Sequence, residues 1–238
     1  MNRVNLFNSS FENPFKGINA NGIDDNEMLK YWHSPFKTFI KEYSEDYIFN
    51  DLQSIVFMGG RGTGKTMILR YFSYDVQKLE SKKLNENLIE HMQKIKSLGF
   101  YIRFGLELKS FEGFEYPQEK WKIIFIHYFE LSICSKYINV LIDLEKNNQI
   151  CTQTVNTLLI PALKQTLGCD NTEYISLFDV KTILNNRLME INKFREDIVF
   201  HNAEFKPVKL FKEKDLSFEV VRLIKKYIPA LSTVTFLI

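Results

Sequence analysis

The sequence is poor in several residue types, and each shortage excludes a class of protein. Among 238 residues there are 3 cysteines, Cys134, Cys151 and Cys169, an odd number without a CxxC pair. A disulfide framework and a zinc knuckle therefore have no support, and the thiols are expected to be buried in a reducing cytoplasm. Only 10 glycines and 6 prolines occur, which favours long regular elements over a loop-rich β protein.

Neither sign of charge prevails in the sequence. The 31 Lys and Arg residues nearly balance the 29 Asp and Glu residues, for a formal net charge of +2, so no global basic excess indicates a nucleic-acid or membrane partner. A local basic patch is still compatible with these numbers. The start of the chain lacks the apolar core of a signal peptide, and no run of about 18 apolar residues could span a bilayer. We therefore expect a cytoplasmic protein without a membrane partner.

Aromatic residues, in contrast, are plentiful, with 21 Phe and 11 Tyr. Hydrophobic residues make up 45% and charged residues 25% of the chain, which is typical of a folded globular protein with a sizeable core. Residues 1–50 are expected to form a lead-in with short helices, beginning with an Asn- and Ser-rich segment that docks by its rings. Residues 51–238 are expected to form one domain, with a helical insertion at about 118–230.

The spacing of apolar residues predicts where the regular elements lie. Short apolar runs predict strands at Ser54–Met58, Phe100–Phe104 and Ser232–Ile238. Apolar residues at three- and four-residue spacing from Met67 to Leu79 predict a helix directly after the first of these strands. Further helix is expected over Leu84–Ser97, as one or two long helices from Pro117 through Leu141, over Thr152–Leu167 with a kink or break at Pro161, over Leu177–Phe200 and over Ser217–Tyr227. This order predicts an α/β fold with an incomplete parallel sheet.

Between the first strand and its helix, the chain matches GxxxxGK[ST], the P-loop, as Gly59-Gly60-Arg61-Gly62-Thr63-Gly64-Lys65-Thr66. Glycines let the backbone curl so that successive N–H groups point at phosphate oxygens, and the helix N-terminus adds partial positive charge. Lys65 would bridge the β- and γ-phosphates, while the Thr66 hydroxyl would be one ligand of a Mg²⁺ ion on the same phosphates. Arg61 is expected to be solvated rather than to reach a neighbouring subunit or a nucleic acid.

Hydrolysis requires more than a phosphate socket, because one acid must hold the Mg²⁺ shell and a base must orient the attacking water. The candidate inside the chain is Val140–Glu145, where Asp143 follows an apolar run. Helical periodicity runs straight through this segment, so we prefer a helix face. The apolar strand at Val234–Ile238 is better placed, but no acid follows it. The sequence thus contains the phosphate cradle without the carboxylates of a hydrolytic site, and the catalytic residues stay unknown.

Other candidate sites are weaker. The histidines have no metal-binding spacing, so core or surface roles are preferred; they are His33, His91, His127 and His201. A base-stacking platform of aromatic residues is conceivable, but their helical spacing favours the core; they are Trp121, Phe125, Tyr128 and Phe129. The guanine-reading pattern is absent, because Asn192–Arg195 ends in the wrong residue. ATP is therefore the expected nucleotide.

The stretch SIVFMGGRGTGKTMILRYFS resembles the AAA-type ATPases of the origin-recognition class that occur in bacteria, often as large ATP-binding proteins of mobile or defence loci. FYIRF, WKIIFIHYFELSI and the helix leading through Ile228–Leu231 into an apolar strand are similar to that family's layout. By matching positions, the resemblance implies nucleotide binding by Gly59, Gly64, Lys65 and Thr66, with the backbone between them. An Asp-Glu pair, sensor residues and an arginine finger follow in that family but not here, so we expect a truncated protein or a naturally split ATPase half.

Three functions stay open at this point. The first is an ATPase, or its N-terminal part, that couples binding and hydrolysis of Mg·ATP to assembly or remodelling of a protein partner or a homo-oligomer. The second is a non-hydrolysing, nucleotide-gated interaction module in a defence or mobile-element system, which the missing acids favour. The third is an inactive fragment whose stability would not respond to Mg·ATP. Nucleic-acid binding is suggested by the resemblance alone.

Overall fold

The computed structural model describes residues 22–32, 58, 64–102, 118–168, 176–201 and 216–237. The chain divides into two compact units, Met1–Tyr101 and Ile102–Ile238, and each unit is considered by itself. The boundary predicted after residue 50 does not coincide with this division. It stays a prediction, together with the domain at 51–238, because residues 33–57 lie outside the described part of the chain.

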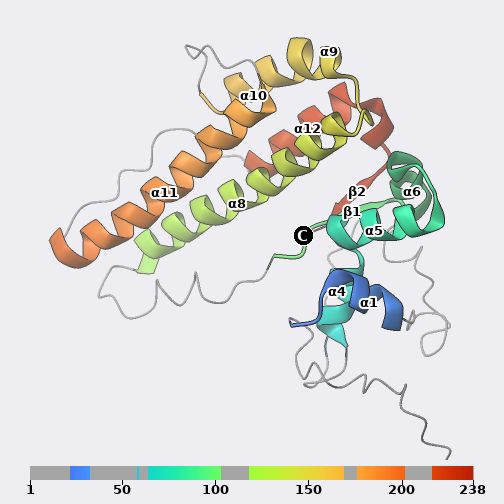
Figure 1. The fold of residues 1–238 in the computed structure, drawn as a ribbon. Helices are drawn as coiled ribbons and strands as arrows, with labels where there is room; N and C mark the ends of the chain where they lie inside the picture. The colour runs from blue at the N-terminus through green and yellow to red at the C-terminus, as the bar shows by residue number, and fades with distance from the viewer. Residues whose placement is uncertain are drawn as a thin grey trace, which may run out of the picture. The chain divides into compact units, whose positions relative to one another are not determined.

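The described part of the first unit is helical apart from one short strand. Side-chain caps explain where two of its helices begin. Asp24 accepts a hydrogen bond from the backbone N–H of Glu27 at 2.9 Å, and Asn87 accepts one from that of Ile89 at 2.9 Å. The elements are α1 (Asp25–Tyr31), α4 (Lys65–Tyr71), α5 (Tyr74–Leu84), α6 (Leu88–Ile95) and the strand β1 (Ser97–Gly99) (Figure 1).

The single helix predicted over Met67–Leu79 is wrong, because the structure interrupts it between α4 and α5. The backbone N–H and the hydroxyl of Ser73 both donate to the carbonyl of Arg70, at 2.9 and 2.6 Å. Ser73 itself is extended, with φ −72° and ψ 149°, and it forms a parallel bridge with Gly99. Apolar spacing continues across the break, so periodicity alone could not reveal it; the tertiary bridge decides the local backbone.

Gly99 is required where β1 passes the break between α4 and α5. A Cβ atom on Gly99 would lie 2.2 Å from the carbonyl oxygen of Phe72 and 2.9 Å from its carbonyl carbon. Both are backbone atoms, so no side-chain movement could relieve the contact. The strand predicted at Phe100–Phe104 is wrong over residues 100–102, which have no regular structure; the observed strand lies earlier, at Ser97–Gly99, and residues 103 and 104 are outside the described part.

The second unit is built around α8 (Gln118–Lys146), a helix of 29 residues. It packs against α11 (Leu177–His201) and α12 (Leu216–Tyr227), and α11 runs along it in Figure 1. The sequence predicts these three helices, and the structure confirms them. The remaining elements are α9 (Thr152–Thr154), the π-helical turn η1 (Val155–Leu159), α10 (Ile160–Thr166), the 3-10 turn η2 (Pro229–Leu231) and the strand β2 (Thr235–Leu237).

The kink or break predicted at Pro161 takes the form of a π-helical turn just before this residue, and the backbone is not broken at Pro161 itself. Proline has no backbone N–H to donate to the preceding turn, and its ring crowds the carbonyl four residues earlier. The helical stretch widens into the π-helical turn η1 directly before α10, in which Pro161 occupies the first turn. Such turns are typical of places where the regular ladder of helical hydrogen bonds is interrupted.

The predicted incomplete parallel sheet is not confirmed. The described residues are mostly helical and contain two strands of three residues each. Of the predicted strand Ser54–Met58, only Met58 is described, and it is exposed and without regular structure. The prediction at Ser232–Ile238 is confirmed in part, because β2 lies within it.

Two expectations about side-chain burial are partly wrong. Cys134 is fully buried and burial raises its pKa, but Cys151 is exposed, and Cys169 lies outside the described part. Tyr128 is buried as expected, whereas the side chain of Phe125 is 40% exposed. The reason is that α8 carries apolar residues on more of its circumference than its described neighbours cover.

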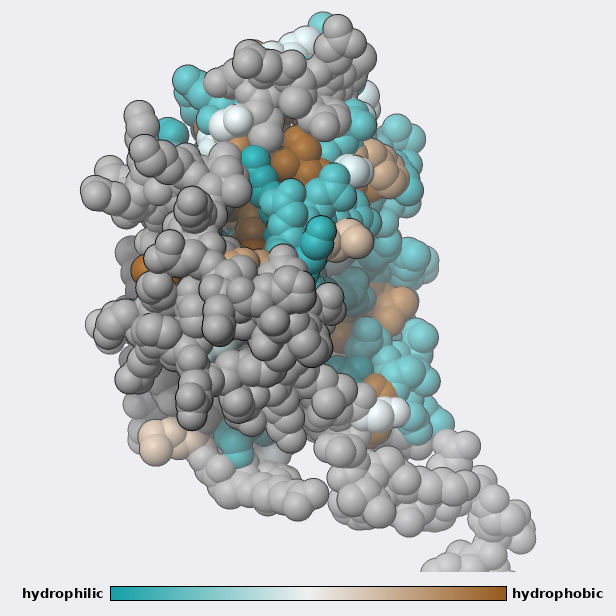
Figure 2. Space-filling model, turned by 90° about the vertical axis from the view of Figure 1, so that its left-hand side faces the viewer, coloured by the Kyte–Doolittle hydropathy of each residue, from teal (hydrophilic) through white to brown (hydrophobic). Residues whose placement is uncertain are grey.

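The described surface is mostly polar on the face drawn in Figure 2, with apolar side chains lying between the polar ones. Large exposed apolar residues occur on several helices, for example Ile123, Phe125 and Ile126 on α8, Phe178 and Met189 on α11 and Phe218 on α12. No helix in the described part is long and apolar enough to cross a membrane.

Replacing Gly99 by Ala should destabilise the first unit by about 2 kcal/mol or more, because the new methyl group collides with the backbone of Phe72. Thermal or urea unfolding followed by circular dichroism would measure this loss. Ser97→Ala in the same strand is the matched control. Ser97 is fully buried and its hydroxyl has no hydrogen-bond partner among the described residues, so removing it should be neutral or stabilising. Equal losses in the two variants would contradict the steric explanation.

Candidate phosphate-binding site

Three of the eight predicted P-loop residues are described, and they form the start of α4. Gly64 is the N-cap and has the left-handed conformation, with φ 82° and ψ 4°. Lys65 and Thr66 are the first two residues of the helix, which begins when Gly64 accepts a hydrogen bond from Ile68 at 3.0 Å. Residues 59–63 lie outside the described part of the chain.

Gly64 suits this position because of its backbone conformation and not because of crowding. A left-handed φ strains any residue with a side chain, whereas no atom lies within 4 Å of the place where its Cβ would be. The first backbone N–H groups of a helix have no partner within the helix, and no side chain caps α4. Lys65 and Thr66 are half-buried at the start of α4, and a helix N-terminus is the kind of structure that can bind phosphate.

The far end of α4 is braced by α1. Arg70, which is only 9% exposed, forms an ion pair with Asp25. Beside this pair, the ring of Trp32 stacks on that of Tyr71, with centroids 4.1 Å apart and planes 12° from parallel. Helix α1 thus contributes to the support of the P-loop helix. The docking by rings that the sequence predicts for the Asn- and Ser-rich start of the chain stays a prediction, because residues 1–21 lie outside the described part.

A second support comes from α5. Gln77 is 2% exposed, and its amide nitrogen donates to the carbonyl oxygen of Tyr71 at 2.6 Å. This carbonyl belongs to the last residue of α4, where helical carbonyls lack a partner within the helix. The amide oxygen of Gln77 lies 3.0 Å from Nε2 of His91. A continuous chain of polar contacts therefore joins the end of α4 to α6.

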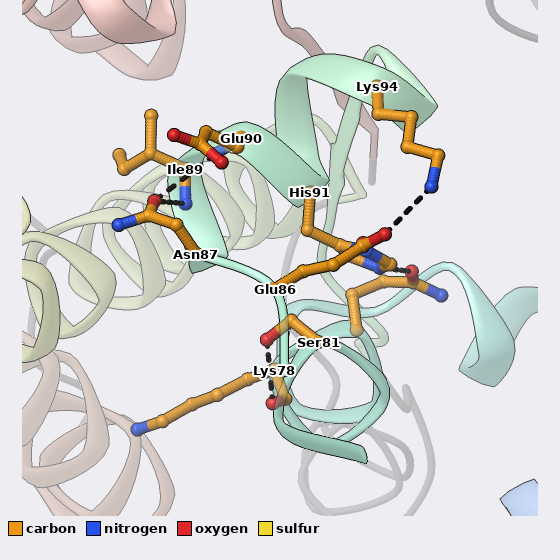
Figure 3. A network of polar contacts seen from close by, with 9 residues as sticks. Lys78, Ser81, Glu86, Asn87, Ile89, Glu90, His91 and Lys94 are labelled. Atoms are coloured by element: carbon orange, nitrogen blue, oxygen red, sulfur yellow. Dashed lines mark hydrogen bonds and ion pairs between the residues drawn. The ribbon is translucent and has the colours of Figure 1, made fainter. Parts of the chain in front are cut away.

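His91 is in turn held by Glu86, in the connection between α5 and α6 (Figure 3). Nδ1 of the imidazole lies 2.6 Å from one carboxylate oxygen of Glu86, and Lys94 donates to the other oxygen at 2.8 Å. Lys94, and next His91, lower the pKa of the Glu86 carboxyl below its usual 4.5. At neutral pH Glu86 is thus a carboxylate.

Sequence reasoning missed Asp25, Arg70, Gln77 and His91 as supports of α4. A signal was present for two of them, since Arg70 interrupts an apolar run and His91 occurs three residues after the buried Leu88. Each indicates a polar side chain that must find a partner inside the fold. The partner of Arg70 is 45 positions away in the sequence, however, and spacing alone does not identify it.

The alternative acidic site within Val140–Glu145 is overturned, and the preferred helical interpretation is confirmed. Asp143 lies inside α8, and its carbonyl accepts the backbone N–H of Asn147 at 3.1 Å. An acid that holds Mg²⁺ at the end of a strand cannot be placed here. Among the described residues, no group of His, Cys, Asp and Glu is arranged to hold a metal ion, and the Mg²⁺ role of Thr66 stays a prediction.

Comparison with known proteins gives one match. A family model described as ORC-CDC6-like matches residues 13–238, which span both compact units and the whole candidate site. No curated protein and no solved structure matches the chain.

Replacing Asp25 by Asn should destabilise the first unit by about 1 to 3 kcal/mol, because the buried guanidinium of Arg70 would lose its ion pair with the Asp25 carboxylate. We expect a smaller loss of stability than for a fully buried ion pair, because the Asp25 side chain is 34% exposed. Urea unfolding would measure it. Glu27→Gln on the exposed face of the same helix should change stability by less than about 0.5 kcal/mol. Equal effects of the two substitutions would show that the ion pair contributes nothing specific.

Proposed function

We propose, from the fact that the chain belongs to the ORC-CDC6-like family, that it binds Mg·ATP at residues 59–66. Membership in this family relates the chain to the AAA-type ATPases. The observation that carries the proposal is the left-handed Gly64 immediately before α4, with Lys65 and Thr66 as the first helical residues. This is the local geometry that the P-loop motif requires at its carboxyl end.

Each residue of the loop has a separate role in the proposed site. The backbone N–H groups of Gly59, Gly60, Arg61, Gly62 and Thr63 would continue the row of donors that begins at α4, and together they would surround the β-phosphate. The ammonium group of Lys65 would bridge the β- and γ-phosphates. The hydroxyl of Thr66 would be one ligand of the Mg²⁺ ion bound to those phosphates.

The support of α4 favours this proposal, because a phosphate socket works only if its donors are held in place before the ligand arrives. Contacts from α1 and α5 hold the other end of the helix, through the ion pair of Arg70, the stacked ring of Tyr71 and the amide of Gln77. Nucleotide would bind at the start of a helix whose other end is already fixed. We propose that this binding is coupled to assembly with a protein partner or a second copy; nucleic-acid binding and a cytoplasmic location stay predictions.

Replacing Lys65 by Ala should weaken binding of Mg·ATP at least about tenfold, since a charge-assisted contact to the phosphates is lost. Isothermal titration calorimetry on the purified chain would measure the dissociation constants. Lys82→Ala, which removes an exposed lysine from the last turn of α5, is the matched control and should bind as the unmodified protein does. An unchanged affinity of the Lys65 variant for Mg·ATP would contradict the proposal.

A second candidate function is a nucleotide-gated interaction module that does not hydrolyse ATP. The observation that favours it is the position of Asp143 within α8, which removes the internal candidate for the metal-holding acid. A gate requires only binding, whereas a motor requires the chemical step. Self-association should therefore be promoted equally by ATP and by a non-hydrolysable analogue, as measured by analytical ultracentrifugation. Association that needs ATP turnover would favour the ATPase instead.

A further inference from the structure

Helix α8 packs against α11 and α12 with two different sides. The hydroxyl of Ser135 lies 3.5 Å from the amide oxygen of Asn185 on α11, which marks one side. Glu130 faces α12, because its carboxylate accepts the backbone N–H of Ser217. Side chains five positions apart on a helix point about 140° away from each other, since each residue turns by about 100°. The side of α8 toward α12 is therefore distinct from the side toward α11.

The side of α8 toward α12 is buried over only part of its length. Spacing of three and four residues places Ile123, Ile126, Glu130, Ile133 and Tyr137 along one line of the helix. Ile133 and Tyr137 are 1% and 2% exposed, whereas Ile123 and Ile126 are 46% and 47% exposed. The change occurs at Glu130, where α12 begins, and α12 lies beside the later part of α8 in Figure 1. The apolar line thus continues onto the surface beyond the start of α12.

Charged residues flank the exposed part of this line in a particular order. Lys122, which is exposed, lies four positions before Ile126, and Glu130 lies four positions after it. One oxygen of the Glu130 carboxylate accepts from Ser217, and a carboxylate has room for further donors. Adjacent exposed isoleucines with charged residues at their edge are typical of a surface that binds another protein.

The order of the charges identifies which partner fits. If two copies of α8 cross in antiparallel directions at Ile126, Lys122 of each copy lies beside Glu130 of the other, and two ion pairs form at once. Parallel helices would instead bring like charges together. A two-fold contact of this kind uses the same patch on both copies. Because α12 begins at Glu130, the two helices must cross at an angle, as packed helices commonly do.

We propose that two copies of the chain associate through this exposed stripe of α8, formed by Lys122, Ile123, Ile126 and Glu130, with the two-fold axis at Ile126. The inference deepens the proposed function and rests on its assembly step, for which it names the surface and the partner. A single crossing of two helices buries less area than the about 1,200 Å² of a stable interface. The association is therefore weak, which suits an assembly that nucleotide binding promotes.

Analytical ultracentrifugation of the full chain, with and without Mg·ATP, measures the association. Ile126→Asp should raise the dimer dissociation constant at least about tenfold, because it places two carboxylates at the axis. Lys122→Glu should raise it about three- to tenfold, since both ion pairs become repulsive. Lys136→Glu, at an exposed position farther along α8, makes the same change of charge and should associate as the unmodified chain does. Equal effects of Lys122→Glu and Lys136→Glu would overturn the predicted pairing.

Cross-linking tests the antiparallel arrangement. In a chain whose exposed Cys151 is replaced by serine, Ile126→Cys should form a disulfide-linked dimer in oxidised glutathione, because the two copies of this residue meet at the axis. Lys122→Cys should not, since its two copies lie about 12 Å apart along the helix, beyond the about 7 Å between Cα atoms that a disulfide spans. The Cys151→Ser chain alone is the control for the remaining thiols. Cross-linking at residue 122, or none at residue 126, would overturn the arrangement.

The failure of this inference is distinguishable from failure of the proposed function. If the unmodified chain binds Mg·ATP but stays monomeric with and without it, the inference is overturned while nucleotide binding stands. If Ile126→Asp associates as well as the unmodified chain, the stripe is not the contact surface, and self-association through another surface stands. If the chain binds no Mg·ATP but loses its association on Ile126→Asp, nucleotide binding fails and the contact surface stands.

Discussion

The hydrogen bond between the amide of Gln77 and the carbonyl of Tyr71 is the contact on which the candidate site depends most directly. A helix of seven residues is too short to be stable by its own hydrogen bonds, so α4 exists because other elements hold it. Gln77 secures the last carbonyl from the side of α5, while Asp25 and Trp32 brace Arg70 and Tyr71 from the side of α1. The start of α4 can present its amides in one place only because its end is fixed.

The interior of the first unit is partly polar, and this has consequences for how it responds to change. Arg70, Ser73, Gln77, His91 and Ser97 are all buried. Hydrogen bonds are directional, so buried polar groups specify one alignment of the helices that carry them, and leaving one unpaired costs more than the bond contributes.

The second unit follows a different principle, because its core is apolar and its long helices pack side by side. Leu131, Ile138 and Leu141 of α8 are buried, and burial of such side chains contributes about 1.5 to 3 kcal/mol each. One polar contact also links α8 to α12. The carboxylate of Glu130 accepts a hydrogen bond from the backbone N–H of Ser217, in the first turn of α12, at 2.6 Å. This carboxylate satisfies a donor that the helix itself cannot, and it ties together residues 87 positions apart.

The sequence by itself determined the elements whose causes are local. Periodicity predicts helix over α8, α11 and α12, a missing N–H predicts an irregularity near Pro161, and a motif of adjacent residues predicts the glycine before Lys65. Tertiary structure decided the rest. The break at Ser73 depends on the bridge to Gly99, and the partners of Arg70 and His91 depend on which helices meet. Hydrogen bonds and ion pairs act over about 3 Å in space, and linear spacing carries no information on which distant residues come that close.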